Sequence, residues 1–242
     1  MKLGILADIH SNLEALRCAL DALKDVSGFI CPGDIVGYGP NPNECVEIVR
    51  GLDCRTVAGN HEYACIRKTD PSYFTGDAKE AIEWTSKVLT EENRKFLEGL
   101  PEYLETNDCE IVHGSLRDPL VEYIFSVQIG AATIELMKKK ICFVGHLHTS
   151  LVVVKENGGK YDGWQLNDGD VVDTKKFDKA VINVGGVGQP RDMDPRASFG
   201  IFDTEKGTVE IRKVEYDIQA VQDKMRKAKL PEFLIERLKY GR

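Results

Sequence analysis

The sequence predicts an α/β fold, because short apolar strands alternate with amphipathic helices along its first half. Residues 2–7, 29–31 and 55–58 each read as a strand, and a helical pattern follows the first two. Each of these strands ends in a small residue followed by a carboxylate, an amide or an imidazole. In open α/β sheets ligands bind beyond the carboxyl ends of the strands, so these polar residues are the first candidates for a functional site.

The first strand leads into a helix that we expect to extend to about residue 23. Ser11 with Glu14 fits a capping box, and leucines recur at helical spacing behind them. Asp8 and His10 lie between strand and helix, and their i, i+2 spacing directs both side chains the same way in extended backbone. The alternative is that Asp8 is a turn residue and His10 a cap.

The next two units repeat this arrangement. One strand ends at Gly33-Asp34, after which Asn41 and Pro42 predict a helix start, and the third strand ends at Gly59-Asn60-His61-Glu62. We therefore expect a largely parallel core. Residues 63–100 are mostly helical, with Thr90 capping a second helix, and contain no obvious chemistry. They are predicted to be an insertion that shapes access to the site.

The middle of the chain supplies the remaining histidines. A predicted hairpin over residues 103–112 ends at His113, and a helix over residues 127–139 leads to an apolar strand that ends at Gly145-His146-Leu147-His148. His146 and His148 are again two residues apart. On their own they would be two ordinary polar loop residues. Beyond them we expect an antiparallel meander, a strand, a hairpin and a helical tail, over residues 151–177, 180–184, 199–214 and 217–239.

Composition sets limits on the class of protein. The chain has 242 residues without a repeat or linker, and we predict a single domain over residues 1–242. Its formal net charge is −7, which argues against long nucleic acid as a partner but leaves small phosphorylated substrates open. Residues 3–7 are too short for a signal segment, and no run approaches the roughly 18 apolar residues of a membrane span. Seven cysteines without a Cys-x-x-Cys motif read as free thiols, so we expect a cytoplasmic protein and no membrane partner.

The strand-end residues form one set that includes every histidine of the chain: Asp8, His10, Asp34, Asn60, His61, His113, His146 and His148. Without a thiolate, the set suits Mn, Fe, Co or Zn. Leaving out His61, seven ligands exceed the number that one ion takes, but two divalent ions sharing a carboxylate would use them all. Two such ions, about 3.5–4 Å apart, activate a bridging water for in-line displacement at phosphorus.

In this order the motifs Asp8-Ile9-His10, Gly33-Asp34, Gly59-Asn60-His61-Glu62, His113 and Gly145-His146-Leu147-His148 resemble the signature of the calcineurin-like metallophosphoesterase superfamily. The match covers residues 1–192 and is most similar to the small bacterial and archaeal phosphodiesterase-like branch. The resemblance implies a four-layer α/β/β/α sandwich with a helical insertion. It also implies a first ion held by Asp8, His10 and His148, a bridging Asp34, and a second ion held by Asn60, His113 and His146. His61 would lie beside the substrate, stabilising the transition state or protonating the leaving oxygen.

The function that this implies is metal-dependent hydrolysis of small phosphomono- or phosphodiesters by a metal-bridging hydroxide. One alternative is a non-catalytic relative that serves as an interaction module, although such proteins usually lose ligand residues. A nuclease is a second alternative, and the acidic balance speaks against it. The substrate, the metal and the oligomeric state are left open.

The chain departs from the superfamily pattern at one point. Protein phosphatases carry an Arg shortly after the Gly-Asp motif, whereas here Asp34 is followed by Ile35-Val36-Gly37-Tyr38-Gly39. This disfavours a Ser/Thr protein phosphatase and the diadenosine-tetraphosphatase type that shares the Arg. Arg191 is the substitute candidate for contact with phosphate, unless it is a surface cation paired with Asp192 or Asp194. Asn183 and Tyr38 are further candidates.

Overall fold

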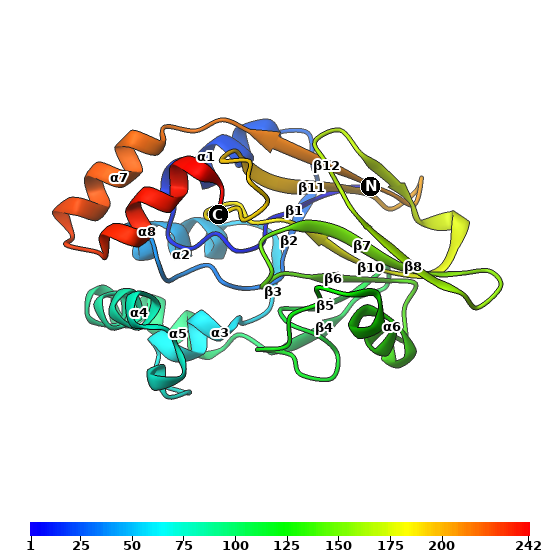
Figure 1. Cartoon of the computed structure of the whole chain (residues 1–242), viewed down its shortest axis with the longest axis horizontal. Coiled ribbons are helices and arrows are strands. Elements are labelled where there is room, and N and C mark those ends of the chain that lie inside the picture. Colours follow the sequence, from blue (N-terminus) through cyan, green and yellow to red (C-terminus); the bar gives the residue numbers. More distant parts are fainter.

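The computed structural model describes residues 1–242 and contains two six-stranded sheets, packed face to face between layers of helices (Figure 1). The first sheet has the order β3-β2-β1-β11-β12-β9 and consists of β1 (Lys2–Ile5), β2 (Gly28–Cys31), β3 (Cys54–Thr56), β9 (Val171–Asp173), β11 (Ala197–Asp203) and β12 (Thr208–Val214). The second has the order β4-β5-β6-β10-β7-β8 and consists of β4 (Tyr103–Glu105), β5 (Glu110–Val112), β6 (Ile141–Val144), β7 (Ser150–Glu156), β8 (Tyr161–Gln165) and β10 (Phe177–Val184).

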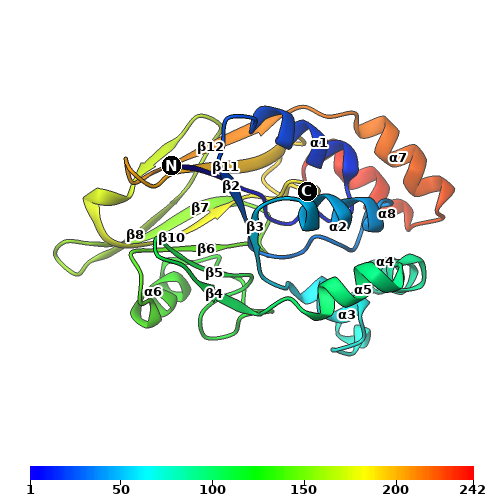
Figure 2. The same ribbon diagram turned by 180° about the vertical axis from the view of Figure 1, so that it is seen from behind.

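Helices cover the outer faces of both sheets (Figure 2). α1 (Leu13–Ala22) and α2 (Pro42–Gly51) pack on the first sheet, and α6 (Val127–Leu136) packs on the second. The remaining helices are α3 (Asn60–Cys65), α4 (Gly76–Val88), α5 (Glu91–Glu98), α7 (Ile218–Lys227) and α8 (Glu232–Glu236), with short 3-10 turns η1 (Pro71–Tyr73), η2 (Thr174–Lys176) and η3 (Arg237–Tyr240). The predicted four-layer sandwich is confirmed. No helix is both long and apolar enough to cross a membrane.

A central strand such as β6 is apolar throughout because both of its faces are buried. In β6, Ile141 and Phe143 point into the core between the sheets, where Phe143 meets Phe202 with ring centroids 5.4 Å apart. Cys142 and Val144 point the other way, under α6. This alternation is why such a strand appears in the sequence as a continuous apolar run rather than an amphipathic one.

Two predictions about the sheets are wrong. The core is mixed rather than largely parallel, since only β1-β2-β3 and β5-β6-β10 run parallel and the other neighbours pair antiparallel. The expected three-stranded meander is also split, because β7 and β8 pair in the second sheet whereas β9 pairs with β12 in the first. Turn residues mark where the chain reverses, but they do not say which of two stacked sheets the next strand joins.

The start of α1 also differs from the prediction. Asn12, not Ser11, is the N-cap, and its side chain accepts a hydrogen bond from Ala15 N at 3.1 Å. Ser11 has a positive φ of 55°, and its backbone N–H donates to the Ile35 carbonyl at 2.8 Å. Ser11 therefore still belongs to the loop that carries the site, so the helix begins one residue later than the capping-box pattern suggests.

The helical segment after residue 63 and the C-terminal helices lie close together. Thr90 caps α5 as predicted, accepting a hydrogen bond from Asn93 N, and the tail breaks at Pro231 between α7 and α8. Ala81 of α4 packs in one apolar cluster with Val221 of α7 and Leu234 of α8. These two parts of the chain therefore support each other beside the strand ends.

Candidate metal centre

The predicted strand-end residues meet at the carboxyl ends of β1, β2, β3, β5 and β6, so both sheets contribute. They form two clusters in which one ligand atom from each residue lies within 4.8 Å of the others: Asp8, His10, Asp34 and His148 in the first, and Asp34, His113 and His146 in the second. Asp34 is common to both. Asn60 Oδ1 lies 3.1 Å from His113 Nε2 and so extends the second cluster.

In the first cluster, the rings of His10 and His148 turn nitrogen lone pairs toward each other. His10 Nδ1 donates to the Val36 carbonyl at 2.9 Å, and His148 Nδ1 donates to the Gln189 carbonyl at 2.6 Å. With these protons on Nδ1, both Nε2 atoms of the neutral rings are bare, yet they lie only 3.0 Å apart. Such a contact is repulsive unless a cation accepts both lone pairs. A carbonyl behind each ring is also the usual support of a metal-bound histidine.

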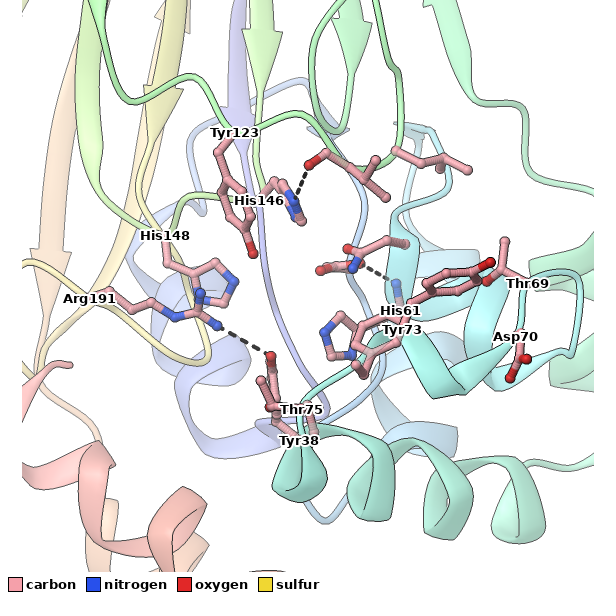
Figure 3. Close-up of a pocket in the computed structure, with 16 residues that line it drawn as sticks. Tyr38, His61, Thr69, Asp70, Tyr73, Thr75, Tyr123, His146, His148 and Arg191 are labelled. Atoms are coloured by element: carbon pink, nitrogen blue, oxygen red, sulfur yellow. Dashed lines mark hydrogen bonds between the residues drawn. The ribbon is translucent and has the colours of Figure 1, made fainter.

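The second cluster repeats this pattern. His113 Nδ1 donates to the Pro32 carbonyl at 2.8 Å, and His146 Nε2 donates to the Val121 carbonyl at 3.2 Å (Figure 3 draws the latter). The inner nitrogens, His113 Nε2 and His146 Nδ1, are 3.1 Å apart. All four imidazoles are therefore oriented by a backbone carbonyl on the outside, with the other nitrogen directed at the centre.

The carboxylates also have unsatisfied atoms at the centre. The Oδ2 atoms of Asp8 and Asp34 are buried and have no hydrogen-bond partner. Asp34 Oδ2 lies 3.5 Å from His10 Nε2 and 3.3 Å from His113 Nε2, so it faces both clusters. Leaving a buried carboxylate oxygen unpaired is costly, and a bound cation removes that cost. The donor set therefore fits two divalent ions that share Asp34.

In the metal-free chain, bound protons supply part of the positive charge that the ions would bring. Burial raises the pKa of Asp8 to about 7. Burial would lower the pKa of His113, but the carboxylate of Asp34 outweighs it and raises that pKa to about 9. Burial likewise opposes ionisation of Asp34, yet His113 and His61 hold its pKa well below the usual value. Metal binding would release such protons, because ligands bind in their deprotonated form.

The other three imidazoles are neutral at physiological pH. Burial is the main cause in each case, and it lowers the pKa values of His10 and His148 far below the usual range and that of His146 to about 3. Neutral imidazole is the form that binds a metal ion. These three imidazoles can therefore bind a cation without loss of a proton.

The backbone at the centre is strained. Ten residues other than glycine have a positive φ, and five of them belong to the two clusters: Asp8, His10, Asp34, His146 and His148. For such residues this conformation is uncommon and costs on the order of 1–3 kcal/mol each. Strain of this kind persists where surrounding structure over-determines it. Here the loops hold one another, since His10 N donates to the Asp34 carbonyl and Gly145 N to the His113 carbonyl, both at 2.9 Å.

His61 belongs to neither cluster. Its backbone N–H donates to Asp34 Oδ1 at 3.0 Å, and its ring lies with its centroid 4.7 Å from that of His10 and 5.1 Å from that of Phe74. Its Nδ1 atom is buried without a partner, and burial lowers its pKa to about 4. A Cβ atom on Gly37 would lie 2.2 Å from this nitrogen, so the ring occupies its place only because residue 37 is glycine.

Glu62 organises the loops beneath the clusters, a role that its place in the motif did not reveal. Its carboxylate accepts backbone N–H groups from Asp34 at 2.8 Å, Val36 at 3.0 Å and Gly59 at 2.7 Å. Burial raises the pKa of Glu62 to about 7, against these N–H groups, which favour the ionised form. One carboxylate thus ties the loop after β2 to the loop after β3.

Arg191 borders the cleft above the clusters and is not paired with a carboxylate. Its guanidinium donates to Gln189 Oε1 at 2.9 Å and to the Tyr38 hydroxyl at 3.5 Å (Figure 3). The alternative of pairing with Asp192 or Asp194 is wrong, because Asp192 pairs with Lys213 and Asp194 with Arg196 and Lys213.

Asn183 is a scaffold residue rather than a substrate contact, since its amide donates to the Gly145 carbonyl at 2.7 Å.

The cleft itself has a volume of about 520 Å³ and reaches from the clusters to the surface. Besides predicted residues, it is lined by aromatic and apolar side chains that the sequence did not single out, chiefly Tyr73, Phe74, Leu120, Val121 and Tyr123. They come from the segment between α3 and α4 and from the loop between β5 and α6. Neither stretch has a periodic pattern or a motif, so only the fold reveals that both line one cleft.

Comparison with known proteins agrees with this geometry. Residues 1–207 match the calcineurin-like phosphoesterase superfamily domain. A relative from Methanocaldococcus jannaschii, described as an uncharacterised protein, is 41% identical over 99% of this chain and 98% of its own. The crystal structure of a metallophosphoesterase from Sphaerobacter thermophilus is similar with a TM-score of 0.91 and 41% identity, over 100% of both chains.

A hypothetical protein from Pyrococcus horikoshii shares the fold, with a TM-score of 0.82 and 22% identity over 100% of this chain and 98% of its own. The profile match covers most of the chain, and the fold and the strand-end motifs are those that the superfamily resemblance implied. The chain belongs to the calcineurin-like phosphoesterase superfamily.

Proposed function

We propose that this protein is a binuclear metal-dependent phosphoesterase that hydrolyses small phosphomono- or phosphodiesters. The observation that carries the proposal is the position of Asp34 between two clusters of inward-facing, uncompensated donor atoms. Membership of the superfamily supports the reaction class. The cleft above the clusters supplies room for a small substrate.

In this proposal Asp8, His10 and His148 hold one ion, Asn60, His113 and His146 hold the other, and Asp34 bridges them. The nitrogen and oxygen donors suit Mn, Fe, Zn or Co. Bound ions would neutralise charge on the phosphoryl oxygens and supply an activated water for in-line attack. The carbonyls behind the four imidazoles keep the rings oriented for this task.

His61 and Arg191 would act on the substrate from the cleft. His61 is held beside the clusters by Asp34 and Gly37, where its ring can donate to a phosphoryl oxygen or to the leaving oxygen. Arg191, free of carboxylates, can offer its guanidinium to the phosphate.

The test is Asp34→Asn, assayed with Mn²⁺ on p-nitrophenyl phosphate and bis(p-nitrophenyl) phosphate. Loss of the shared charge should reduce turnover by roughly a thousandfold, since metal stabilisation of the transition state amounts to several kcal/mol. Asp203→Asn is the matched control, because Asp203 of β11 stands opposite Lys2 in the strand register, at the end of β1 away from the site. Undiminished turnover by Asp34→Asn would refute the proposal.

A non-catalytic relative that uses the fold as an interaction module is the competing function. Elemental analysis after reconstitution with Mn²⁺ separates the two. The phosphoesterase proposal expects two ions per chain, whereas a chain that retains no ion and turns over no ester would be a scaffold.

A further inference from the structure

Outside the metal centre, the cleft has aromatic and apolar walls on two sides. Large apolar side chains remain exposed at its rim, with Tyr73 at 89%, Val121 at 55% and Tyr123 at 40% exposure. Exposed apolar residues gathered around a cleft mark a binding surface. We propose that this cleft binds a planar aromatic group on the organic part of the substrate, such as a nucleobase. The inference rests on the proposed function and names the substrate class of that site.

Tyr123 provides a rigid platform for such a group. Its ring stacks on His146, with centroids 3.7 Å apart and planes 16° apart. His146 donates to the Val121 carbonyl, so Tyr123 stacks on a ring whose orientation is set by a hydrogen bond. One face of the ring is covered by His146, yet the residue is 40% exposed and lines the cleft. A preorganised aromatic face stacks a planar ligand at little entropic cost.

The opposite wall comes from the segment between α3 and α4. Tyr73 ends the turn η1, which Asp70 caps by accepting a hydrogen bond from Ser72 N at 2.9 Å. Phe74 follows, half-buried, with its ring edge-on to His61. Figure 3 shows Tyr73 and Tyr123 approaching the cleft from different sides, with His61 and His146 between them. A ligand over the clusters would therefore meet an aromatic ring on each side.

The size and polarity of the cleft agree with one nucleotide-sized ligand. Its volume of about 520 Å³ lies in the usual range for small-molecule sites. The polar end, with Asp34, His148 and Arg191, suits the phosphate, while the rings lie toward the rim. Stacking between rings favours a flat group over an aliphatic chain, which would gain only apolar contact. Stacking of a base on an aromatic side chain is worth about 1–3 kcal/mol.

The first experiment compares adenosine 5′-monophosphate with ribose 5-phosphate, each as the monoester and as its methyl diester, with Mn²⁺. The two share the same 5′ oxygen, and ribose 5-phosphate has an anomeric hydroxyl where the nucleotide has its base, so the reacting ends are matched. We expect kcat/KM to be at least tenfold higher with the base present, mainly through KM. Equal values for the pair, or a preference for n-hexyl phosphate over both, would overturn the inference while leaving the phosphoesterase function intact.

Variants locate the effect. Tyr123→Leu and Tyr73→Ser should each reduce the preference for the adenosine compound by about 5- to 150-fold, the range that corresponds to one stacking contact. Tyr123→Phe keeps the ring and should keep the preference. Tyr240→Ser is the matched control, because Tyr240 is 51% exposed and does not line the cleft. A preference unchanged in both Tyr123→Leu and Tyr73→Ser would contradict the assignment.

A binding measurement separates this inference from the reaction. Saturation-transfer NMR on the metal-free protein should detect adenosine but not ribose, with loss of the adenosine signal in Tyr123→Leu. If no phosphoester is hydrolysed but adenosine binds, the proposed function fails and the aromatic site stands. If esters are hydrolysed but adenosine shows no binding and no preference, the aromatic site fails alone.

Discussion

The candidate metal centre and the rim of the cleft come from different parts of the chain. They differ in how firmly hydrogen bonds hold their side chains. At the centre, each of the four imidazoles donates to a backbone carbonyl that fixes its ring, such as the Val36 carbonyl behind His10. At the rim, Tyr73 is 89% exposed, and its short turn is capped by the exposed side chain of Asp70. The candidate metal ligands are thus fixed at strand ends, whereas the residues that we propose to contact the organic group lie on surface loops.

The largest expected effect tests the centre. His61→Ala should lower kcat by about 10²- to 10⁴-fold, because the ring N–H donor beside the phosphoryl group is lost. The number of ions bound per chain should stay the same, since His61 lies in neither cluster. Steady-state kinetics together with elemental analysis check this, and loss of an ion would show that His61 is a ligand instead.

Glu62→Gln tests how firmly the centre is supported. An amide can accept at only one of the two oxygen positions, so at least the Val36 N–H loses its partner. An unsatisfied buried donor costs about 1–3 kcal/mol, and the free energy of unfolding should fall by that amount in urea titrations. Glu205→Gln, whose side chain is 85% exposed, is the control and should change stability little. Equal free energies of unfolding for the two variants would show that the Glu62 carboxylate does not stabilise these loops.

Arg191→Lys tests the boundary between centre and rim. A lysine keeps the charge but not the planar fork, so KM for a phosphoester should rise by about 10-fold or more, with a smaller change in kcat. Arg212→Lys serves as the control, because Arg212 lies on β12 and does not line the cleft. A KM equal to that of the wild type would show that Arg191 does not contact the phosphate.

The smallest effect is expected from Tyr38→Phe at the edge of the cleft. Its hydroxyl accepts from Arg191 at 3.5 Å, the outer limit of a hydrogen bond. Removing this hydroxyl should raise KM by about two- to fivefold, because a hydrogen bond this long is weak. A larger change than in Arg191→Lys would mean that Tyr38 contacts the substrate itself.

The same contrast explains what the sequence could predict. Asp34 and the histidines were recognisable because each follows an apolar strand at fixed spacing, and parallel strand ends converge at one edge. The rim residues Tyr73 and Tyr123 lie in loops without periodicity, where position depends on long-range packing. The partner of β9 was missed for a similar reason, since either sheet offered an apolar face. The shift of the α1 cap from Ser11 to Asn12 followed from the positive φ that the site loop imposes, which no local pattern encodes.

An anomalous difference map from crystals of the Mn²⁺-reconstituted protein would test the shared role of Asp34 most directly. We expect two peaks, one among Asp8, His10 and His148 and one among Asn60, His113 and His146, with the Asp34 carboxylate between them. A single peak, peaks elsewhere, or an Asp34 side chain that contacts neither ion would contradict it.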